Sequence, residues 1–120
     1  MACLMPFKGE VWNVNLDPTR GHEQAKIRPC VVISNDQLNT RLSLSIVVPF
    51  TSSPFYTKSG KLSPAMVEIL PPEAGLSKPS YTLAFQVRSV SHVRFIKKIG
   101  ALSAAKLEAV VNSVQDIIAN

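Results

Sequence analysis

Short stretches of alternating or continuous apolar residues, separated by turn-forming residues, dominate this chain and predict strands rather than helices. Residues 10–16 alternate between apolar and polar side chains, which indicates a half-buried strand. Residues 30–34 form a continuous apolar run, which is typical of a fully buried strand. Further strands are predicted at residues 43–50, 66–70, 81–90 and 96–99.

Only one stretch, residues 103–119, carries apolar side chains at a spacing that predicts a helix. The apolar stripe comprises Leu107, Val110, Val111, Val114, Ile117 and Ile118. Ser103 can cap the amino end, and we expect the stripe to cover one open side of a sheet. Five or six short strands followed by one terminal helix predict a mainly β fold, built as a small, strongly bent sheet or barrel.

The length and charge of the chain narrow its class. With 120 residues and no internal repeat or linker, it is predicted to form one domain spanning residues 1–120. Its formal net charge of +5 favours an anionic partner, and charge alone does not choose between nucleic acid, an acidic protein and a membrane surface. No apolar run approaches the roughly 18 residues of a membrane span, and no secretory signal is present, so we expect a cytoplasmic protein.

Candidate metal ligands and nucleophiles are scarce in the sequence. Cys3 and Cys30 form neither a CxxC pair nor a Cys/His cluster, and His22 and His92 lack the spacing of metal ligands. We expect two reduced thiols and no metal or other cofactor. GxSxG, GxxxxGK[ST] and GxGxxG motifs are absent, so neither a serine nucleophile elbow nor a nucleotide-binding loop is indicated.

A long polar segment separates the first two predicted strands, although a hairpin needs only about two to five loop residues. Its cationic and hydrogen-bonding residues are Thr19, Arg20, His22, Glu23, Gln24, Lys26 and Arg28. Arg28 precedes Pro29, which favours an extended backbone at the start of the next strand. A guanidinium there suits a phosphate, because its planar fork donates two parallel hydrogen bonds. In the alternative interpretation, Arg28 pairs with Asp17 or Glu23 and merely holds the loop.

Two further groups of polar residues lie at or near predicted strands. Thr51, Ser52 and Ser53 can bind phosphate oxygens, but hydroxyls before a proline are also an ordinary turn signal. Gln86 and Arg88 lie two apart on the predicted strand 81–90 and therefore share a face, which borders either a polar groove or solvent. Residues 51–64 are rich in serine and lysine and are predicted to form a flexible loop.

The segment GEVWNVNLDPTRGHEQAKIRPCVVISND resembles the opening of the MazF/PemK family of toxins. In that family the pattern is G-[ED]-[IV]-[WY], a proline, G-x-E-Q and R-P before an apolar strand. This chain supplies Gly9, Glu10, Val11, Trp12, Pro18, Gly21, Glu23, Gln24, Arg28 and Pro29 in that order. IVVPFTSS and FQVRSV are similar to two later motifs of the family, so the resemblance covers nearly the whole chain.

The resemblance implies an SH3-like small barrel with a carboxy-terminal helix, usually a homodimer. It also implies a metal-independent endoribonuclease that cuts single-stranded RNA and is covered by an antitoxin, which we expect to be acidic and partly disordered. At the matching positions, Arg28 is the expected catalytic arginine and Thr51 the expected catalytic hydroxyl. The residues expected to bind RNA are Thr19, Arg20, Glu23, Gln24, Ser52, Ser53, Gln86 and Arg88.

One departure from the family pattern, one histidine and two competing functions bear on this interpretation. Phe85 stands where the family often has an acidic or amide residue, so a cleavage sequence cannot be carried over. His22 occupies a variable position, and the general base is left unassigned. The competing hypotheses are a CcdB-like inhibitor of DNA gyrase, which would depend on the terminal helix, and an inactive RNA-binding barrel.

Overall fold

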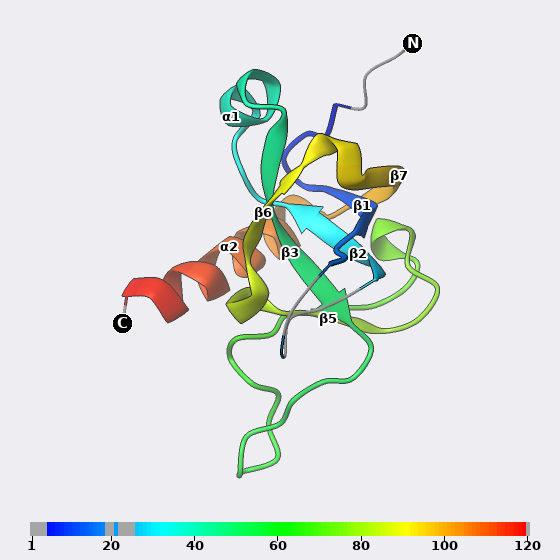
Figure 1. The fold of residues 1–120 in the computed structure, drawn as a ribbon. Helices are drawn as coiled ribbons and strands as arrows, with labels where there is room; N and C mark the ends of the chain where they lie inside the picture. Colours follow the sequence, from blue (N-terminus) through cyan, green and yellow to red (C-terminus); the bar gives the residue numbers. More distant parts are fainter. Residues whose placement is uncertain (1–4, 19–20, 22–25, 120) are drawn as a thin grey trace.

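A computed structural model describes residues 5–18, 21 and 26–119 of the chain (Figure 1). Its strands are β1 (Glu10–Asn15), β2 (Ile27–Val32), β3 (Leu44–Thr51), β4 (Glu68–Ile69), β5 (Ser80–Thr82), β6 (Arg88–Ser91) and β7 (Phe95–Ala101). The helices are α1 (Asp36–Arg41) and α2 (Ala104–Ala119), and three short 3-10 turns are η1 (Glu73–Gly75), η2 (Ala84–Gln86) and η3 (His92–Arg94). Among the described residues, no helix is long and apolar enough to cross a membrane.

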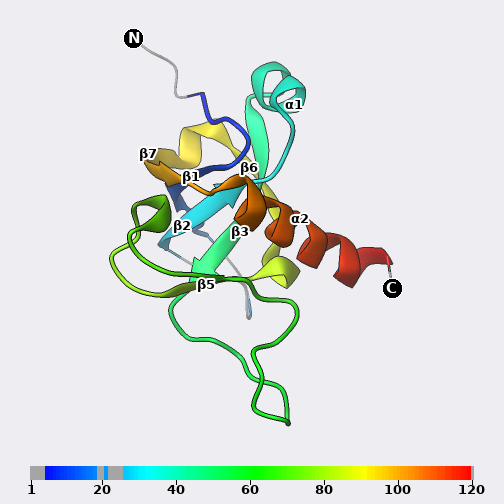
Figure 2. The same ribbon diagram turned by 180° about the vertical axis from the view of Figure 1, so that it is seen from behind.

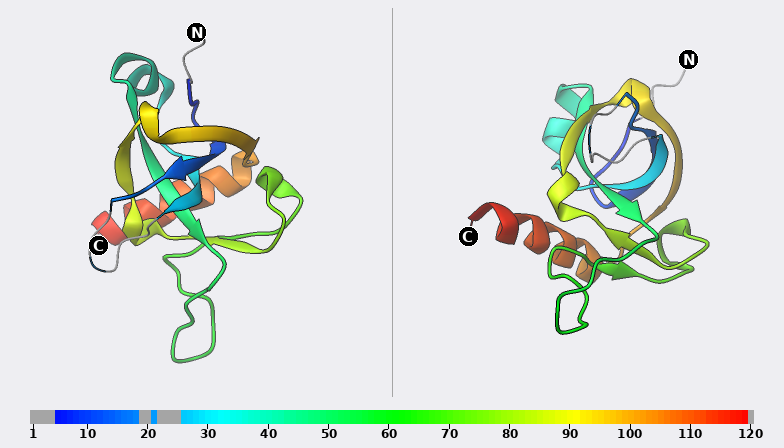
Figure 3. Two further views of the ribbon diagram at one scale, coloured as in Figure 1. Left: turned by 45° about the vertical axis from the view of Figure 1, so that its right-hand side comes forward. Right: turned by 60° about the horizontal axis from the view of Figure 1, so that its bottom comes forward.

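The strands form one antiparallel sheet in the order β4-β5-β3-β2-β1-β7, with β6 also paired to β3. The eight-residue strand β3 holds the sheet together, because it pairs with β2 along one edge and with β5 and β6 along the other. Seen from its lower end, the sheet curls into a nearly closed ring with α2 alongside (Figure 3, right). This arrangement agrees with the predicted bent sheet or barrel with a terminal helix.

Two apolar cores lie on opposite faces of the curled sheet, because neighbouring residues of a strand point in opposite directions. The barrel core is enclosed by the strands and comprises Trp12, Val14, Leu16, Cys30, Val32, Val47, Val90 and Phe95. The helix core lies between the sheet and α2, and Figure 2 shows α2 in front of the sheet. Members of the helix core include Val11, Val31, Val48, Phe50, Val110 and Val114. Burial on both faces explains why β2 and β3 have continuous apolar runs rather than alternation.

Most predicted elements are confirmed, with shifts of a few residues at their ends. β1, β2 and β3 correspond to the first three predicted strands, β4 lies within 66–70, and β7 includes 96–99. α2 corresponds to the predicted helix, and the Ser103 hydroxyl accepts a hydrogen bond from the Lys106 amide at 3.3 Å. The predicted stripe is only partly buried, since Ile117 and Ile118 near the end of α2 remain exposed.

The prediction of one continuous strand over residues 81–90 is wrong. β5 and β6 both pair with β3, but the η2 turn interrupts them and shifts their registers relative to one another. The turn forms because the Gln86 and Val87 amides donate to the carbonyls of Leu83 and Ala84 instead of to β3. Gln86 and Arg88 therefore do not share a strand face: Gln86 belongs to η2, and Arg88 is the first residue of β6.

Helix α1 was not predicted from the sequence. Its amino end is capped by Asn35, whose side-chain oxygen accepts a hydrogen bond from the Leu38 amide at 2.9 Å. Asn39 is fully buried and anchors the helix through its side-chain oxygen, which accepts hydrogen bonds from the hydroxyls of Ser34 and Ser45. The signal was present in the sequence, because the Asn35–Asp36 pair that suggests a turn is equally a helix start.

His92 extends this buried network. Its Nε2 atom lies 2.9 Å from the Ser45 hydroxyl oxygen. Because the single hydroxyl proton of Ser45 is donated to Asn39, the Nε2–H of His92 is the donor to Ser45. Burial lowers the pKa of His92 from its ordinary value, and a hydrogen bond with the Leu44 backbone opposes that effect only in part.

Stability is therefore expected to fall as the pH falls from about 7 to about 5, through the ordinary pKa range of histidine. His92 takes up a proton more readily in the unfolded chain than in the folded protein. The contribution of neutral His92 to the free energy of unfolding is therefore complete above the ordinary histidine pKa and is lost as the pH falls below it. Urea unfolding of the wild type and of His92→Gln across this range measures the effect. An equal pH dependence in the two proteins would contradict the assignment.

Candidate functional site

β2 and β3 place Arg28 and Thr51 on the same face and at the same end of the sheet. The recorded pairs are Val32 with Val47, Val31 with Val48, and Cys30 with Pro49. No pair between β2 and β3 is recorded beyond Cys30 and Pro49; if the same register continued for two residues, Arg28 would lie opposite Thr51, the last residue of β3. Directly opposed residues of antiparallel strands project from the same face, with Cβ atoms about 5 Å apart.

Both side chains lie on the barrel-core face, at the end of the sheet where the strands stop. Arg28 is the cross-strand partner of Val14, which belongs to the barrel core. Pro29 and Pro49 have no N–H to donate, and the recorded ladder between β2 and β3 ends beside them. We call this end of the barrel, beside Arg28 and Thr51, the barrel mouth.

Arg28 offers an exposed cation at this mouth. Arg28 makes no ion pair with any other described residue. The salt bridge found among the described residues joins Lys98 to Glu10. The Asp17 carboxylate instead accepts a hydrogen bond from the Lys26 amide at 2.8 Å. Pairing of Arg28 with Asp17, one form of the alternative drawn from the sequence, is thus contradicted, and Glu23 lies outside the described residues.

Thr51 both closes a turn and retains a hydroxyl proton. Its Oγ1 accepts a hydrogen bond from the Ser53 amide at 3.1 Å, so the turn expected from the three hydroxyl residues is present. Accepting this bond leaves the hydroxyl hydrogen available to a ligand. Thr51 is half-buried, whereas Ser52 and Ser53 are exposed.

A second arginine, Arg88, lies on the same face as Arg28. It is the cross-strand partner of Val47, a barrel-core residue, and its Nη1 is 3.5 Å from the carbonyl oxygen of Leu16. Arg94 on η3 donates to the carbonyl oxygens of Asn15 and Asp17. Sequence reasoning did not single out Arg94, because nothing in its position along the chain indicates that η3 approaches the end of β1.

Cys30 lies close to Arg88 but is not a nucleophile. Burial raises the pKa of the Cys30 thiol to about 12, and the positive charge of Arg88 offsets this only slightly. The thiol also donates a weak hydrogen bond to the Arg28 carbonyl. Its surroundings are those of a core side chain, as the sequence predicted.

We expect the Cys30 thiol to resist alkylation in the native protein, because the reactive thiolate is suppressed and the side chain has no access to solvent. A Cys3→Ser variant isolates this thiol, and its reaction with iodoacetamide at mildly alkaline pH is followed by mass spectrometry. Labelling should be slow in buffer and rapid in denaturant. Rapid labelling of the folded protein would contradict the burial of Cys30.

Thr19, Arg20, Glu23 and Gln24, as well as His22, lie outside the described residues. Gln86 lies in η2, half-buried, three residues after Leu83 and two before Arg88. The part of the predicted site that the structure describes therefore consists of Arg28, Thr51 to Ser53, and Arg88 around the barrel mouth.

The predicted flexible loop after Thr51 is partly ordered. Residues 52–66, which we call the arm, project away from the sheet at the bottom of Figure 1. The arm contains a bridge between Tyr56 and Leu62, and the Thr57 amide donates to the Lys61 carbonyl at 2.7 Å. Phe55 stacks on Phe85 of η2 with ring centroids 5.9 Å apart, which ties the base of the arm to the sheet.

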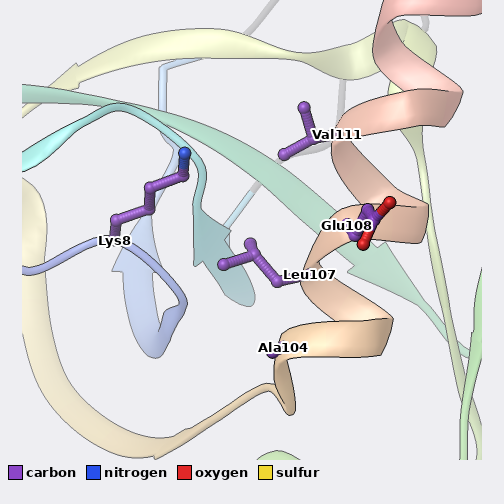
Figure 4. A pocket seen from close by; sticks show the side chains of 5 residues that line it. All are labelled: Lys8, Ala104, Leu107, Glu108 and Val111. Carbon is purple, nitrogen blue, oxygen red and sulfur yellow. The ribbon is translucent and has the colours of Figure 1, made fainter.

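One pocket, of about 260 Å³, lies away from the barrel mouth (Figure 4). It is lined by Lys8, Ala104, Leu107, Glu108 and Val111, and it separates the segment before β1 from the first half of α2. Leu107 also packs against the helix core, so the pocket is on the α2 side of the sheet. Within residues 5–18, 21 and 26–119, no three His, Cys, Asp or Glu side chains gather as metal ligands would.

This chain is similar in sequence to one family of toxins and to two endoribonucleases of the same type. Residues 7–118 match the family described as PemK-like, MazF-like toxin of type II toxin–antitoxin system. Endoribonuclease MazF9 of Mycobacterium tuberculosis is 40% identical over 108 residues, which cover 86% of this chain and 87% of that protein. Endoribonuclease MazF of Staphylococcus saprophyticus is 34% identical over 110 residues, covering 92% of this chain and 88% of that protein.

Solved structures with a similar fold include toxins alone and in complexes. MazF from Deinococcus radiodurans has a TM-score of 0.79 at 27% identity, covering 98% of this chain and 99% of that one. MazF in a MazE–MazF complex from the same organism has a TM-score of 0.72 at 27% identity, covering 97% of both chains. These similarities confirm the predicted fold class, a mainly antiparallel β barrel with a carboxy-terminal helix.

Proposed function

The chain belongs to the family of PemK-like, MazF-like toxins of type II toxin–antitoxin systems and is a MazF-type endoribonuclease. We propose that it cuts single-stranded RNA at a phosphate bound between Arg28 and Thr51. The observation that supports this proposal is that β2 and β3 carry an exposed guanidinium and a strand-terminal hydroxyl on the same face, at the same end of the sheet. Both groups are hydrogen-bond donors suited to phosphate oxygens.

The proposed reaction is an internal transesterification. The 2′-oxygen of one nucleotide attacks the adjacent phosphorus as its proton is removed, and the bond from phosphorus to the 5′-oxygen breaks. The products are a 2′,3′-cyclic phosphate and a 5′-hydroxyl, once the departing oxygen has received a proton. Negative charge grows on the phosphate oxygens in the transition state, so fixed donors aimed at those oxygens lower the barrier most.

Arg28 and Thr51 have separate roles in this reaction. The guanidinium of Arg28 stays charged at neutral pH and presents a planar fork, so it stabilises the developing charge rather than acting as a general base. Thr51 donates its hydroxyl proton to a second phosphate oxygen, while its turn with Ser53 holds the side chain in place. Arg88 is half-buried behind them on the same face, and its charge draws the phosphate backbone toward the mouth.

We further propose that an antitoxin segment covers this mouth and that the chain acts as a homodimer. Relatives have been solved in MazE–MazF complexes and with a cognate antitoxin, and an acidic segment would complement the formal charge of +5. Exposed apolar side chains on α2 and along η3 and β7 offer surfaces for a second copy: Ile117, Ile118, Val93 and Ile96.

Incubation of the purified chain with long single-stranded RNA in EDTA tests the proposal. Discrete cuts whose new ends carry a 5′-hydroxyl and a cyclic phosphate are expected. A gyrase supercoiling assay run in parallel tests the competing binding function and should show no inhibition. RNA that stays intact across a varied set of sequences would overturn the proposal.

A further inference from the structure

The row of cross-strand partners that contains Arg28 and Thr51 continues across two more strands. Tyr81 of β5 is the recorded partner of Thr51, and Glu68 of β4 is the recorded partner of Tyr81. Glu68, Tyr81 and Thr51 are therefore recorded neighbours on one face of the sheet, and an extension of the β2–β3 register by two residues adds Arg28 as the fourth member of the row. Three steps between strands of roughly 4.8 Å make this row about 14 Å long between its outermost backbones.

The row faces solvent rather than the helix core. Ile69, Ser80 and Thr82, the neighbours of Glu68 and Tyr81 along their strands, are buried on the other side. On the face that carries the row, Glu68 of β4 is exposed to solvent and Tyr81 of β5 is half-buried. A ligand whose phosphate sits between Arg28 and Thr51 can therefore extend along the row toward β4.

Charge and shape change in one direction along the row. Arg28 is cationic, Thr51 is a neutral hydroxyl, Tyr81 is an aromatic ring and Glu68 is anionic. Partial burial, and then the charge and hydrogen bond of Glu68, raise the pKa of Tyr81, and the nearby Tyr56 of the arm adds to this effect. Tyr81 is thus uncharged at neutral pH, its hydroxyl is hydrogen-bonded to Glu68, and the Glu68 carboxylate beside it repels phosphate.

We propose that Tyr81 and Glu68 bind the nucleobase next to the scissile phosphate, an assignment that rests on the proposed RNA cleavage between Arg28 and Thr51. The Tyr81 ring stacks on the base, and the Glu68 carboxylate accepts hydrogen bonds from the Watson–Crick edge. Unpaired bases in single-stranded RNA are commonly recognised by stacking on an aromatic side chain and by hydrogen bonds to that edge.

The carboxylate makes the recognition selective. It accepts hydrogen bonds from the amino groups of guanine, adenine and cytosine, whereas uracil has no amino group and its single donor on this edge, N3–H, is flanked by two carbonyl oxygens that the carboxylate repels. The charges of the two side chains also favour one orientation, because the phosphate is drawn to Arg28 and repelled by the Glu68 carboxylate, although the Lys106 ammonium, 3.1 Å from the Glu68 carbonyl oxygen, weakens that repulsion. A base with an exocyclic amino group is therefore preferred at this position and uracil is disfavoured.

Glu68→Gln, Tyr81→Phe and Tyr81→Leu test the assignment, with Glu108→Gln on exposed α2 surface as the matched control for loss of a carboxylate. Cut sites are mapped on a random RNA pool, and affinity is measured with an oligonucleotide carrying a 2′-deoxy nucleotide at the cut. Glu68→Gln should still cut but should accept uracil. Tyr81→Leu should bind about tenfold or more weakly, and Tyr81→Phe, which keeps the ring, should bind nearly as well as wild type.

Unchanged site maps in Glu68→Gln and unchanged affinity in Tyr81→Leu would overturn the assignment. If the wild type itself neither cut nor bound RNA, the proposed function would fail first, so the two failures are distinguishable. Circular dichroism checks folding. Should Tyr81→Leu not fold, the site map of Glu68→Gln decides, because that exposed side chain is not part of either core.

Discussion

We expect Arg28→Ala to cleave RNA about 10³-fold more slowly than the wild type, because it removes the charged donor that stabilises the phosphate in the transition state. The side chain is exposed and makes no ion pair with a described residue, so the fold should be unaffected. Single-turnover cleavage of one mapped site measures the rate, and thermal unfolding measures the stability.

Two comparisons make this expectation specific. Arg41→Ala removes an equal charge from the end of α1, away from the row on β2 and β3, and should cleave at nearly the wild-type rate. Arg28→Lys keeps the charge but loses the two-pronged geometry, so it should recover only part of the rate. Normal cleavage by a folded Arg28→Ala variant would show that the chemistry lies on another residue.

The second large effect is expected at Thr51. Thr51→Val preserves the shape of the side chain and removes the hydroxyl, and the rate of the chemical step should fall by about 10²-fold. Thr51→Ser keeps the hydroxyl and should remain within about tenfold of wild type, since both the turn with Ser53 and the donor persist. Single-turnover rates and affinity for a 2′-deoxy oligonucleotide separate chemistry from binding.

A donor that acts mainly in the transition state changes the rate more than the affinity. If Thr51→Val instead bound the uncleavable 2′-deoxy oligonucleotide much more weakly but, when saturated, cut the all-ribose RNA at an unchanged rate, Thr51 would be a binding residue only. Equal losses in Thr51→Val and Thr51→Ser would indicate damage to the turn rather than loss of the hydroxyl.

The sequence predicted the elements that periodicity determines. β1, β2, β3 and α2 were recovered because apolar side chains recur at the spacing of a strand or helix and are buried on the faces that this spacing selects. The barrel with its terminal helix followed from the order of those elements. The exposure of Ile117 and Ile118 was not predicted, since the spacing of apolar residues selects a helix face but does not show how far the sheet beneath that face extends.

Elements that depend on tertiary hydrogen bonds could not be predicted in the same way. The alternation of residues 81–90 continues through η2, yet the β3 edge is shared by two strands of different register, and a turn must absorb the difference. Helix α1 is short, and Asn39 fixes it by bonding to Ser34 and Ser45, which lie on neighbouring segments. Neither constraint can be read from local composition.

The candidate site was predicted in part. Arg28 and Thr51 came from a resemblance, and what the fold adds is their shared face at one end of the sheet and the absence of an ion pair between Arg28 and Asp17. Tyr81 and Glu68 were missed because they lie far from the polar loop along the chain. Only the pairing of β3 with β5, and of β5 with β4, places them in the same row.

The central claim, that one phosphate is held between Arg28 and Thr51, is tested most directly by a crystal structure with a short RNA whose cut site carries a 2′-deoxy nucleotide. The account predicts that the scissile phosphate accepts hydrogen bonds from the Arg28 guanidinium and the Thr51 hydroxyl at the mouth of the barrel. A scissile phosphate bound elsewhere, with both side chains turned away from it, would contradict the account.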